Sequence, residues 1–250
     1  MGAKNHAIIM PDADREDAIN AMVGACFGST GQRCMAISVS VMVGESAEWI
    51  PEIVEKTKQL SVGSGLENKD IAPLNTKDAL ARVHKIISDS KAAGAEILVD
   101  GRNVNVEGLP KGNWIGATVI DHAKPGMPCY DEEIFAPVMV IVRVDTLQQA
   151  IDLINKNKYG NGVAIFTRSG GHARKFQHEI EAGQVGINLP IPVPLPMFSF
   201  TGNKESMWGT ANFYGKGAIQ FYTQWKTITS RWKEESDDAT KLTTAFPTMK

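Results

Sequence analysis

Residues 14–43 have the sequence DREDAINAMVGACFGSTGQRCMAISVSVMV, which joins a helical pattern to a strand pattern. Asp14, with Asp17 three residues later, is typical of a helix N-terminus. Apolar residues then recur on one helical face, at Ile19, Met22, Val23, Cys26 and Phe27. In residues 37–43, branched apolar residues occupy every second position, which predicts a strand. The helix and the strand are joined by a glycine-bounded turn that ends at Cys34.

The alternation of helix and strand patterns continues to about residue 188. Further strand patterns occupy residues 96–101, 117–121, 138–144, 162–167 and 184–188. Further helix patterns occupy residues 49–60, 146–157 and 172–183, and another helix is expected to begin at Thr76 and end at Gly94. Alternation of this kind is typical of an α/β fold built on a mostly parallel sheet.

The C-terminal part of the chain follows a different pattern. Residues 189–202 (LPIPVPLPMFSFTG) contain four prolines, so we expect an ordered, extended loop. A helix is expected at about residues 213–222 and a strand at residues 225–232, followed by a polar tail. This strand comes after the main series has ended, so its edge is expected to pair with another chain or another domain.

Composition indicates a soluble globular protein. Of the 250 residues, 43% are apolar and 22% are charged, with a formal net charge of −2. This charge gives no basic stripe for a phosphate backbone, so nucleic acid is not an expected partner. The longest aliphatic run, at 138–142, is far shorter than the ~20 residues that a membrane span needs. The start of the chain resembles neither a secretory signal nor a transit peptide.

The cysteines and histidines give no sign of a metal site. The three cysteines, an odd number without CxxC spacing, favour a reducing compartment and argue against a disulfide framework or a zinc site. The five histidines show no metal-ligand spacing with one another, and no metal is expected.

Cys34 has two interpretations from its neighbours alone. Most free cysteines are small buried hydrophobes, which suits Cys26 on the apolar helix face. Cys34 instead lies in a glycine-bounded turn, where free backbone N–H groups can form an oxyanion site, and the adjacent Arg33 can favour a thiolate. Local chemistry leaves both interpretations open for Cys34.

Several longer sequence strings favour the interpretation of Cys34 as a nucleophile. In order, they are GAKNH, GQRC, EEIFxPV, NxYGNGxAIFT, GQVGxN, VPLPMFSFTG and FYGKxxIQFYTQWKTIT. Together they resemble the aldehyde dehydrogenase superfamily over nearly the whole chain. GAKNH, GQRCM and PIPVPLPMFSFTG resemble its branch that acylates coenzyme A with methylmalonate or malonate semialdehyde. The resemblance implies a three-layer αβα catalytic domain at residues 1–208. It also implies a C-terminal helix, an oligomerisation strand and a tail at residues 209–250.

The resemblance also implies roles for individual residues. Cys34 attacks the aldehyde carbonyl, and hydride then passes from the thiohemiacetal to NAD. Glu133 holds the nicotinamide ribose, and Phe135 packs on the nicotinamide. Asn188 supports the turn that holds Cys34, and Phe200 faces the substrate, although both residues could equally be structural.

In this branch the thiol of coenzyme A takes the acyl group, and the β-carboxylate leaves as carbon dioxide or bicarbonate. The products implied are propanoyl-CoA or acetyl-CoA. Arg33 is the nearest candidate to recognise the substrate carboxylate, unless it only tunes the thiol. The family assembles into homo-oligomers, so self-association or assembly with full-length subunits is expected. The implied location is the mitochondrial matrix in a eukaryote and otherwise the cytoplasm.

The sequence departs from the family in two ways. The resemblance covers only the C-terminal half of the family pattern, so the N-terminal Rossmann-like NAD domain, the general-base Glu and the oxyanion Asn are expected to lie outside this chain. In addition, Ala72, Ala117 and Ala136 stand where the family commonly has glycine. Alanine is strained where φ is positive, so these turns indicate either relaxed purifying selection or a local rearrangement.

Three hypotheses follow. The chain is the C-terminal half of an NAD-dependent, CoA-acylating semialdehyde dehydrogenase that is inactive without its other half. Alternatively, it is a non-catalytic paralogue that binds full-length subunits, or an unrelated thiol enzyme that uses Cys34 without nicotinamide. The presence of Cys34, Glu133 and Phe135 together favours the first.

Overall fold

The computed structural model describes residues 2–230 and residue 232. Its centre is a seven-stranded sheet in the order β3-β4-β5-β2-β1-β7-β8. Only the edge strand β3 runs antiparallel to its neighbour, and the other pairs are parallel. The strands are β1 (Asn5–Ile9), β2 (Ile37–Val43), β3 (Glu96–Val99), β4 (Thr118–Asp121), β5 (Val138–Val144), β7 (Gly162–Phe166) and β8 (Gln184–Ile187).

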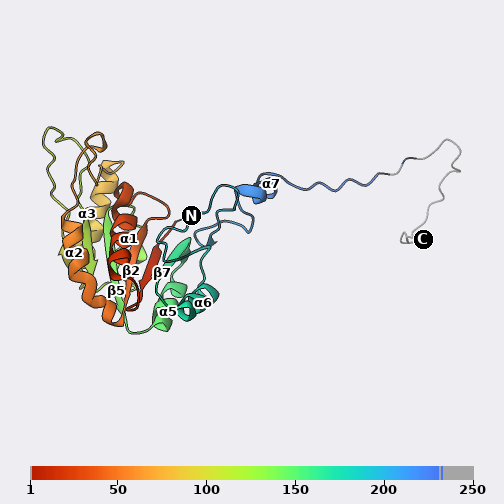
Figure 1. Ribbon diagram of the computed structural model, residues 1–250. Helices are drawn as coiled ribbons and strands as arrows, with labels where there is room; N and C mark the ends of the chain where they lie inside the picture. Colours follow the sequence, from red (N-terminus) through yellow and green to blue (C-terminus); the bar gives the residue numbers. More distant parts are fainter. Residues whose placement is uncertain (1, 231, 233–250) are drawn as a thin grey trace.

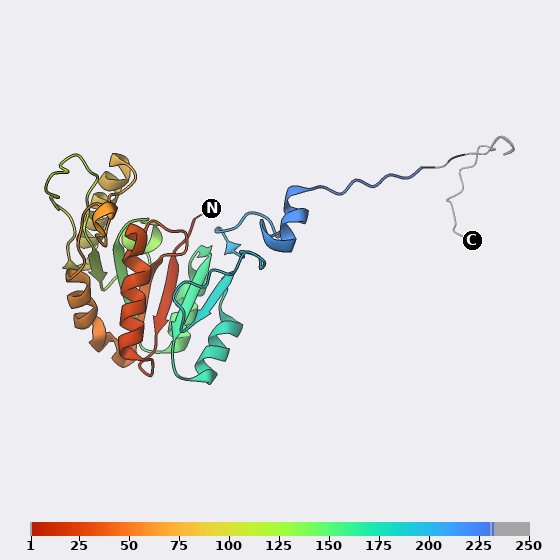
Figure 2. The same ribbon diagram turned by 45° about the horizontal axis from the view of Figure 1, so that its top comes forward.

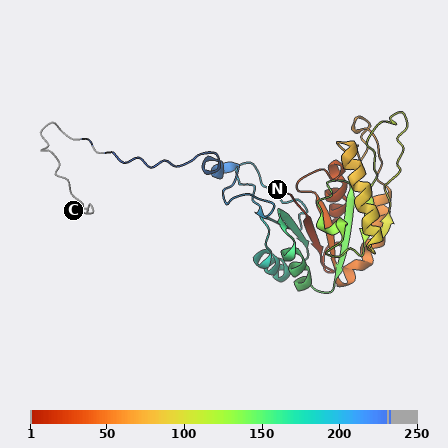
Figure 3. The same cartoon turned by 180° about the vertical axis from the view of Figure 1, so that it is seen from behind.

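Helices cover both faces of the sheet (Figures 1 and 2). One face packs against α1 (Arg15–Phe27) and α2 (Ile50–Lys58), in a core that includes Met22, Phe27 and Ile53. The opposite face, seen from behind in Figure 3, packs against α3 (Lys77–Ala92), α4 (Pro128–Asp131), α5 (Leu147–Lys156) and α6 (Gly170–Glu179). The expected three-layer αβα fold is therefore confirmed.

The centre of the sheet contains a strand that the sequence patterns did not predict. β1 is buried at all five positions and lies between β2 and β7. Its sequence, NHAII, opens with two polar residues, which hide it from a search for alternating or continuous apolar runs. Asn5 and His6 are buried nonetheless, because neighbouring segments supply hydrogen-bond partners.

Most expected elements are present, with shifted ends. Thr76 caps α3 through the N–H of Ala79, and Gly94 follows its end with φ 101°. A 3₁₀ segment (Gly44–Trp49) precedes α2, which therefore begins at Ile50. α6 begins at Gly170, two residues earlier than expected, because the side chain of Ser169 caps it.

The C-terminal part lies beside the sheet and then leaves it. Residues 189–202 form an irregular loop, as expected. After it, β9 (Asn203–Lys204) pairs antiparallel with β6 (Tyr159–Gly160) in a separate two-stranded sheet. The expected helix is reduced to α7 (Ala218–Tyr222) after a 3₁₀ turn. Residues 223–230 run away from the body without strand pairing (Figure 1). The proposed division at residue 208 stays a prediction, and the polar tail at 233–250 lies outside the described residues.

Over the described residues, none of the helices is both long enough and apolar enough to cross a lipid bilayer.

Candidate active site

The chemically interesting residues gather where four parallel strands begin. Cys34 lies just before β2, Asn5 opens β1, and Asn161 immediately precedes β7. The loop at residues 132–137 leads into β5. Because these strands are parallel, their amino ends lie at one edge of the sheet, which brings these segments together.

The turn that carries Cys34 has an unusual backbone. Ser29, Thr30 and Gly31 have positive φ values of 51°, 60° and 65°. Left-handed conformations at Ser and Thr are uncommon and need support from the surroundings. The Thr30 hydroxyl supplies it by accepting a hydrogen bond from the Ala72 N–H (3.0 Å) and donating one to the Ala72 carbonyl (3.2 Å). Gln32 accepts a hydrogen bond from the N–H of Asn75 (3.1 Å).

Two asparagines hold the backbone of Cys34. The side-chain amides of Asn5 and Asn161 both donate to the Cys34 carbonyl, each at 2.9 Å. Asn5 also donates to the Ala36 carbonyl (3.0 Å) and accepts from the N–H of Gly162 (3.0 Å). The main chain of Cys34 is thereby tied to β1 and β7. Neither asparagine was singled out by sequence reasoning, although both stand in the strings that carried the resemblance.

The three thiols differ in exposure. Cys34 is exposed, whereas Cys26 and Cys129 are buried. Burial raises the pKa of both buried thiols, because a thiolate loses its hydration there. Cys34 is therefore the thiol that a reagent or substrate can reach.

Arg33 is engaged by the preceding helix. Its guanidinium donates to the carbonyls of Gly24 (3.3 Å) and Ala25 (3.0 Å) in the last part of α1. A cation at this end satisfies orphan carbonyls and complements the helix dipole. Both observed hydrogen bonds of Arg33 are structural, a role that the sequence analysis did not consider.

The loop that carries Glu133 and Phe135 is fixed from several sides. Arg82 of α3 donates to the carbonyls of Glu133 (3.0 Å) and Ile134 (2.6 Å). The buried ammonium of Lys4 donates to the Glu132 carbonyl (2.7 Å). Phe135 has a φ of 56°, and the residue is 39% exposed. The surrounding contacts thus hold Phe135 in a strained backbone conformation while the residue stays partly exposed to solvent.

The carboxyl group of Glu133 is half-buried, which raises its pKa by desolvation. The backbone N–H of Ala3 and the cations Lys4 and Arg82 act in the opposite direction, because they favour the carboxylate. A carboxyl group in this environment can accept hydrogen bonds from ligand hydroxyls at the rim of the site.

The strain expected at three alanines is not present. Ala72, Ala117 and Ala136 do not have positive φ, whereas the neighbouring Phe135 does. Alanine therefore occupies these three positions without a left-handed backbone. The close approach that requires glycine is on the other side of the contact, at Gly31, where a Cβ atom would overlap the carbonyl of Ala136.

Cys34, Arg33, Glu133 and Phe135 line one small pocket, as the sequence analysis had grouped them. Its volume is about 20 Å³, which is room for about one water molecule and not for a nicotinamide ring. Ligands must therefore approach over the exposed side of Cys34 and Phe135. Within the described part of the chain, no cluster of three or more His, Cys, Asp or Glu residues could hold a metal ion.

The structure gives the described contacts of Asn188 and Phe200, and the roles implied by the resemblance stay predictions. The amide of Asn188 exchanges two hydrogen bonds with the backbone of Thr167 (2.9 and 3.0 Å). The ring of Phe200 packs near Phe213, with centroids 5.5 Å apart. The carbonyl of the next residue, Thr201, accepts from Gln184 at the start of β8, which brings this loop to the same edge of the sheet.

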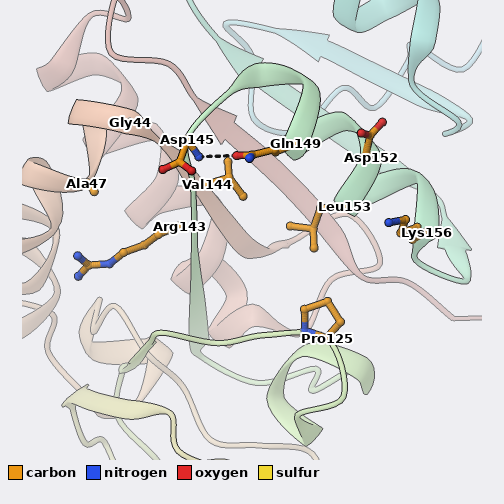
Figure 4. A pocket seen from close by; sticks show the side chains of 10 residues that line it. All are labelled: Gly44, Ala47, Pro125, Arg143, Val144, Asp145, Gln149, Asp152, Leu153 and Lys156. Atoms are coloured by element: carbon orange, nitrogen blue, oxygen red, sulfur yellow. Dashed lines mark hydrogen bonds between the residues drawn. The ribbon is translucent and has the colours of Figure 1, made fainter.

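A much larger pocket of about 700 Å³ lies near the opposite ends of β2 and β5 (Figure 4). Its charged groups do not converge: Arg143 points away from Lys156 and pairs with the buried Asp121. The size of this pocket therefore carries less chemical information than the small pocket at Cys34.

The residues match the model of the "Aldehyde dehydrogenase family" over residues 1–228. The chain belongs to the aldehyde dehydrogenase family. It is 53% identical over 250 residues to the methylmalonate-semialdehyde/malonate-semialdehyde dehydrogenase [acylating] of Bos taurus, which is described as mitochondrial. That alignment covers 100% of this chain and 47% of the bovine protein. The chain thus spans about half the length of the curated relatives it matches.

Solved structures of aldehyde dehydrogenases have the same fold. The putative methylmalonate-semialdehyde dehydrogenase of Sinorhizobium meliloti, complexed with NAD, has a TM-score of 0.88 and 46% identity, and the match covers 95% of this chain and 49% of that one. The methylmalonate-semialdehyde dehydrogenase of Oceanimonas doudoroffii has a TM-score of 0.87 and 46% identity, covering 93% and 48%. These matches establish the fold and the family for about half of such an enzyme.

Proposed function

We propose that this chain supplies the nucleophile and the nicotinamide-facing residues of an NAD-dependent, CoA-acylating methylmalonate or malonate semialdehyde dehydrogenase. One observation carries the proposal: the exposed thiol of Cys34 shares a pocket with Glu133 and Phe135, and both halves of that pocket are fixed by partly buried hydrogen bonds. The names of the relatives support the substrate class.

In the proposed reaction, the thiolate of Cys34 attacks the aldehyde carbon and forms a C–S bond. The carbonyl oxygen becomes an oxyanion, which is then protonated or stabilised by hydrogen-bond donors. NAD, when bound, supplies the hydride acceptor. The acyl group of the thioester then passes to the thiol of coenzyme A, which releases Cys34 as its thiol. The β-carboxylate departs as carbon dioxide or, with water, as bicarbonate, and a proton takes its place on the adjacent carbon. Asn5 and Asn161 hold the main chain of the nucleophile throughout.

The described residues fit the nicotinamide end of NAD. The half-buried Glu133 carboxyl can accept hydrogen bonds from ribose hydroxyls, and Phe135, a residue that is 39% exposed, can offer its ring to the nicotinamide. Contacts for the adenosine and pyrophosphate are proposed to come from polypeptide that corresponds to the other half of the relatives. We therefore infer that the 250-residue chain alone does not reduce NAD.

Two residues are proposed to serve the substrate. Arg33 lines the pocket of Cys34 and is the cation nearest in sequence to the nucleophile, so it is the candidate for the substrate carboxylate. The guanidinium of Arg33 already donates to the Ala25 carbonyl in α1. In this role it binds the substrate carboxylate from the side that faces the Cys34 pocket. Phe200 is proposed to face the substrate from the loop that Gln184 holds at this edge.

A second candidate function is a non-catalytic subunit that binds full-length homologues. Exposed aromatic side chains in the last described segment favour it: Trp225 is 94% exposed and Trp232 is 90% exposed. Homo-oligomerisation through this segment is proposed for the catalytic candidate too. In a eukaryote, the proposed location is the mitochondrial matrix, and otherwise the cytoplasm; the bovine relative is described as mitochondrial.

The test is NADH formation from malonate semialdehyde and coenzyme A, with and without a polypeptide that supplies the other half of a relative. We expect activity only with the added half, and its loss in Cys34→Ala. Cys26→Ala is the matched control, because that thiol is buried. Robust turnover by the chain alone would contradict the division of the NAD site, and activity that survives Cys34→Ala would contradict the nucleophile. Binding to the added half without activity would favour the non-catalytic candidate.

A further inference from the structure

Lys4 is a buried cation next to the candidate active site. It immediately precedes β1, and the residue is only 3% exposed. Its ammonium donates to the carbonyls of Cys129 (2.6 Å) and Glu132 (2.7 Å). Both described acceptors are main-chain carbonyls and neither is a carboxylate. Burying a charged group costs free energy unless the group is paired and hydrogen-bonded. The two carbonyl acceptors of Lys4 therefore need a structural explanation.

The two acceptors lie at the start of the loop that carries Glu133 and Phe135. Cys129 belongs to the short helix α4, and Glu132 is the residue that ends it. The last carbonyls of a helix have no partner within the helix, and a lysine can satisfy them. Lys4 therefore fixes the point at which the chain leaves α4 and enters the loop.

Other contacts fix the same loop further along. Arg82 holds the carbonyls of Glu133 and Ile134, and the carbonyl of Ala136 packs against Gly31 in the turn of Cys34. Arg82 and Gly31 thus hold the middle and the end of the loop, and Lys4 holds its beginning.

The charge on Lys4 also acts on its surroundings. It favours the ionised form of Glu133, in opposition to desolvation. Burial lowers the pKa of Lys4 itself to about 8, while the nearby Cys129, Cys26, Glu133 and Asp131 act to raise it. Lys4 and Glu133 therefore each favour the ionised form of the other.

We propose that Lys4 is a positioning residue that sets the place of Glu133 and Phe135 relative to Cys34. This inference rests on the proposed function, in which Glu133 and Phe135 contact the nicotinamide end of NAD. Lys4 acts through the main chain of the loop and does not itself touch the reacting atoms.

The first test does not depend on activity. In Lys4→Met, amide hydrogen exchange at residues 132–136 should be about tenfold faster than in the wild-type chain, the change expected when a charge-assisted hydrogen bond is lost. Exchange in β2 and β5 should be unchanged. Lys204→Met is the matched control, because Lys204 donates in the same way to the carbonyls of Asn155 (2.7 Å) and Asn157 (3.2 Å), away from the Cys34 pocket.

The second test uses the complemented enzyme. Lys4→Met should raise KM for NAD about tenfold while kcat changes much less, and Lys204→Met should leave both within about twofold. Lys4→Gln, which keeps a donor, should lie between Lys4→Met and the wild type. A Lys4→Met chain with unchanged exchange and unchanged KM would overturn the proposal. Global unfolding of both Lys4 variants, while Lys204→Met stays folded, would also overturn the proposal. Lys4 would then be required for folding and not for the position of the loop.

The two proposals fail separately. If the wild-type complex neither binds nor reduces NAD, the proposed function is wrong. Hydrogen exchange at residues 132–136 then still tests whether Lys4 positions the loop. If the wild-type complex is active and Lys4→Met is indistinguishable from it, only the role of Lys4 is wrong.

Discussion

Gly31 packs directly against the main-chain carbonyl of Ala136, so the turn that carries Cys34 touches the loop that carries Phe135. A Cβ atom at residue 31 would overlap this carbonyl and would also lie 3.1 Å from the carbonyl of Cys26. The φ of Gly31 is 65°, which a residue with a side chain rarely adopts. Two motifs that are distant in the sequence are therefore joined at a position that only glycine fits.

The first prediction concerns this contact. Gly31→Ala should destabilise the chain by about 2–4 kcal/mol, because it combines overpacking with a left-handed alanine. Chemical denaturation measures the loss. The overlap is with main chain, so no side-chain movement can relieve it.

Gly24→Ala is the matched control for Gly31→Ala. Gly24 lies in α1 and is exposed, and a methyl group added there would meet nothing within 4 Å outside the backbone of its own helix. Alanine there should stabilise the chain by roughly 0.5–1 kcal/mol, because it is the better helix former. Opposite signs for the two substitutions are expected, and equal effects would rule out the packing argument.

The second prediction separates two asparagines. Asn161→Ala removes a donor from the carbonyl of Cys34, so kcat/KM of the complemented enzyme should fall about tenfold through misplacement of the nucleophile. Asn188→Gly keeps the left-handed backbone (φ 54°) and removes only the bonds to Thr167, so kcat/KM should change less than about twofold. An equal loss in both variants would contradict this prediction and support the role that the family resemblance gives to Asn188.

How much of the fold could be predicted depends on where the signal lies. Helix caps such as Asp14 and Thr76, and apolar periodicity in β2 and α5, are local, and they placed most elements correctly. β1 was missed because burial of its polar first residues depends on partners far along the chain. Asn5, for example, bonds to Cys34 and Gly162, which no local pattern reveals.

The same reasoning explains the candidate site. The sequence brought Cys34, Glu133 and Phe135 together through motifs, and the structure places them on one pocket. The supporting residues Asn5, Asn161 and Lys4 were not predicted, because their role is to bond main-chain groups whose positions only the fold defines. A polar residue at or directly before the start of a buried strand, as at Asn5 and Asn161, is the signal that could have indicated them.

The third prediction concerns assembly. Exposed apolar residues in an unpaired, extended segment seek a partner, so the chain should self-associate or bind a full-length homologue. Trp225→Glu together with Ile228→Lys should reduce this association, because both side chains are highly exposed (94% and 79%). Size-exclusion chromatography with light scattering measures the mass. Trp208→Glu is the control, because Trp208 lies outside this segment and is 77% exposed. A wild-type chain that stays monomeric and does not bind the homologue would refute the prediction.

The fourth prediction follows from His6, which is buried in β1 and shares a hydrogen bond with the Tyr130 hydroxyl (3.2 Å). Burial, with the nearby Lys4 and Lys204 cations, lowers the pKa of His6 to about 3 from 6.5. Between these values the unfolded chain binds a proton that the folded chain does not. Stability from His6 is therefore complete above about pH 6.5 and falls as the pH drops toward 3.

Between pH 7 and pH 5, His6 should reduce the free energy of unfolding by about 2 kcal/mol. Urea denaturation at both pH values measures this difference, and His6→Gln should remove most of it, because glutamine does not titrate. His84→Gln is the matched control: the pKa of His84 is also lowered by burial, but this residue is less deeply buried, so its contribution should be smaller. Carboxyl groups with lowered pKa, Asp14 and Asp70, titrate below this window. An unchanged difference in His6→Gln would show that His6 is not the group responsible.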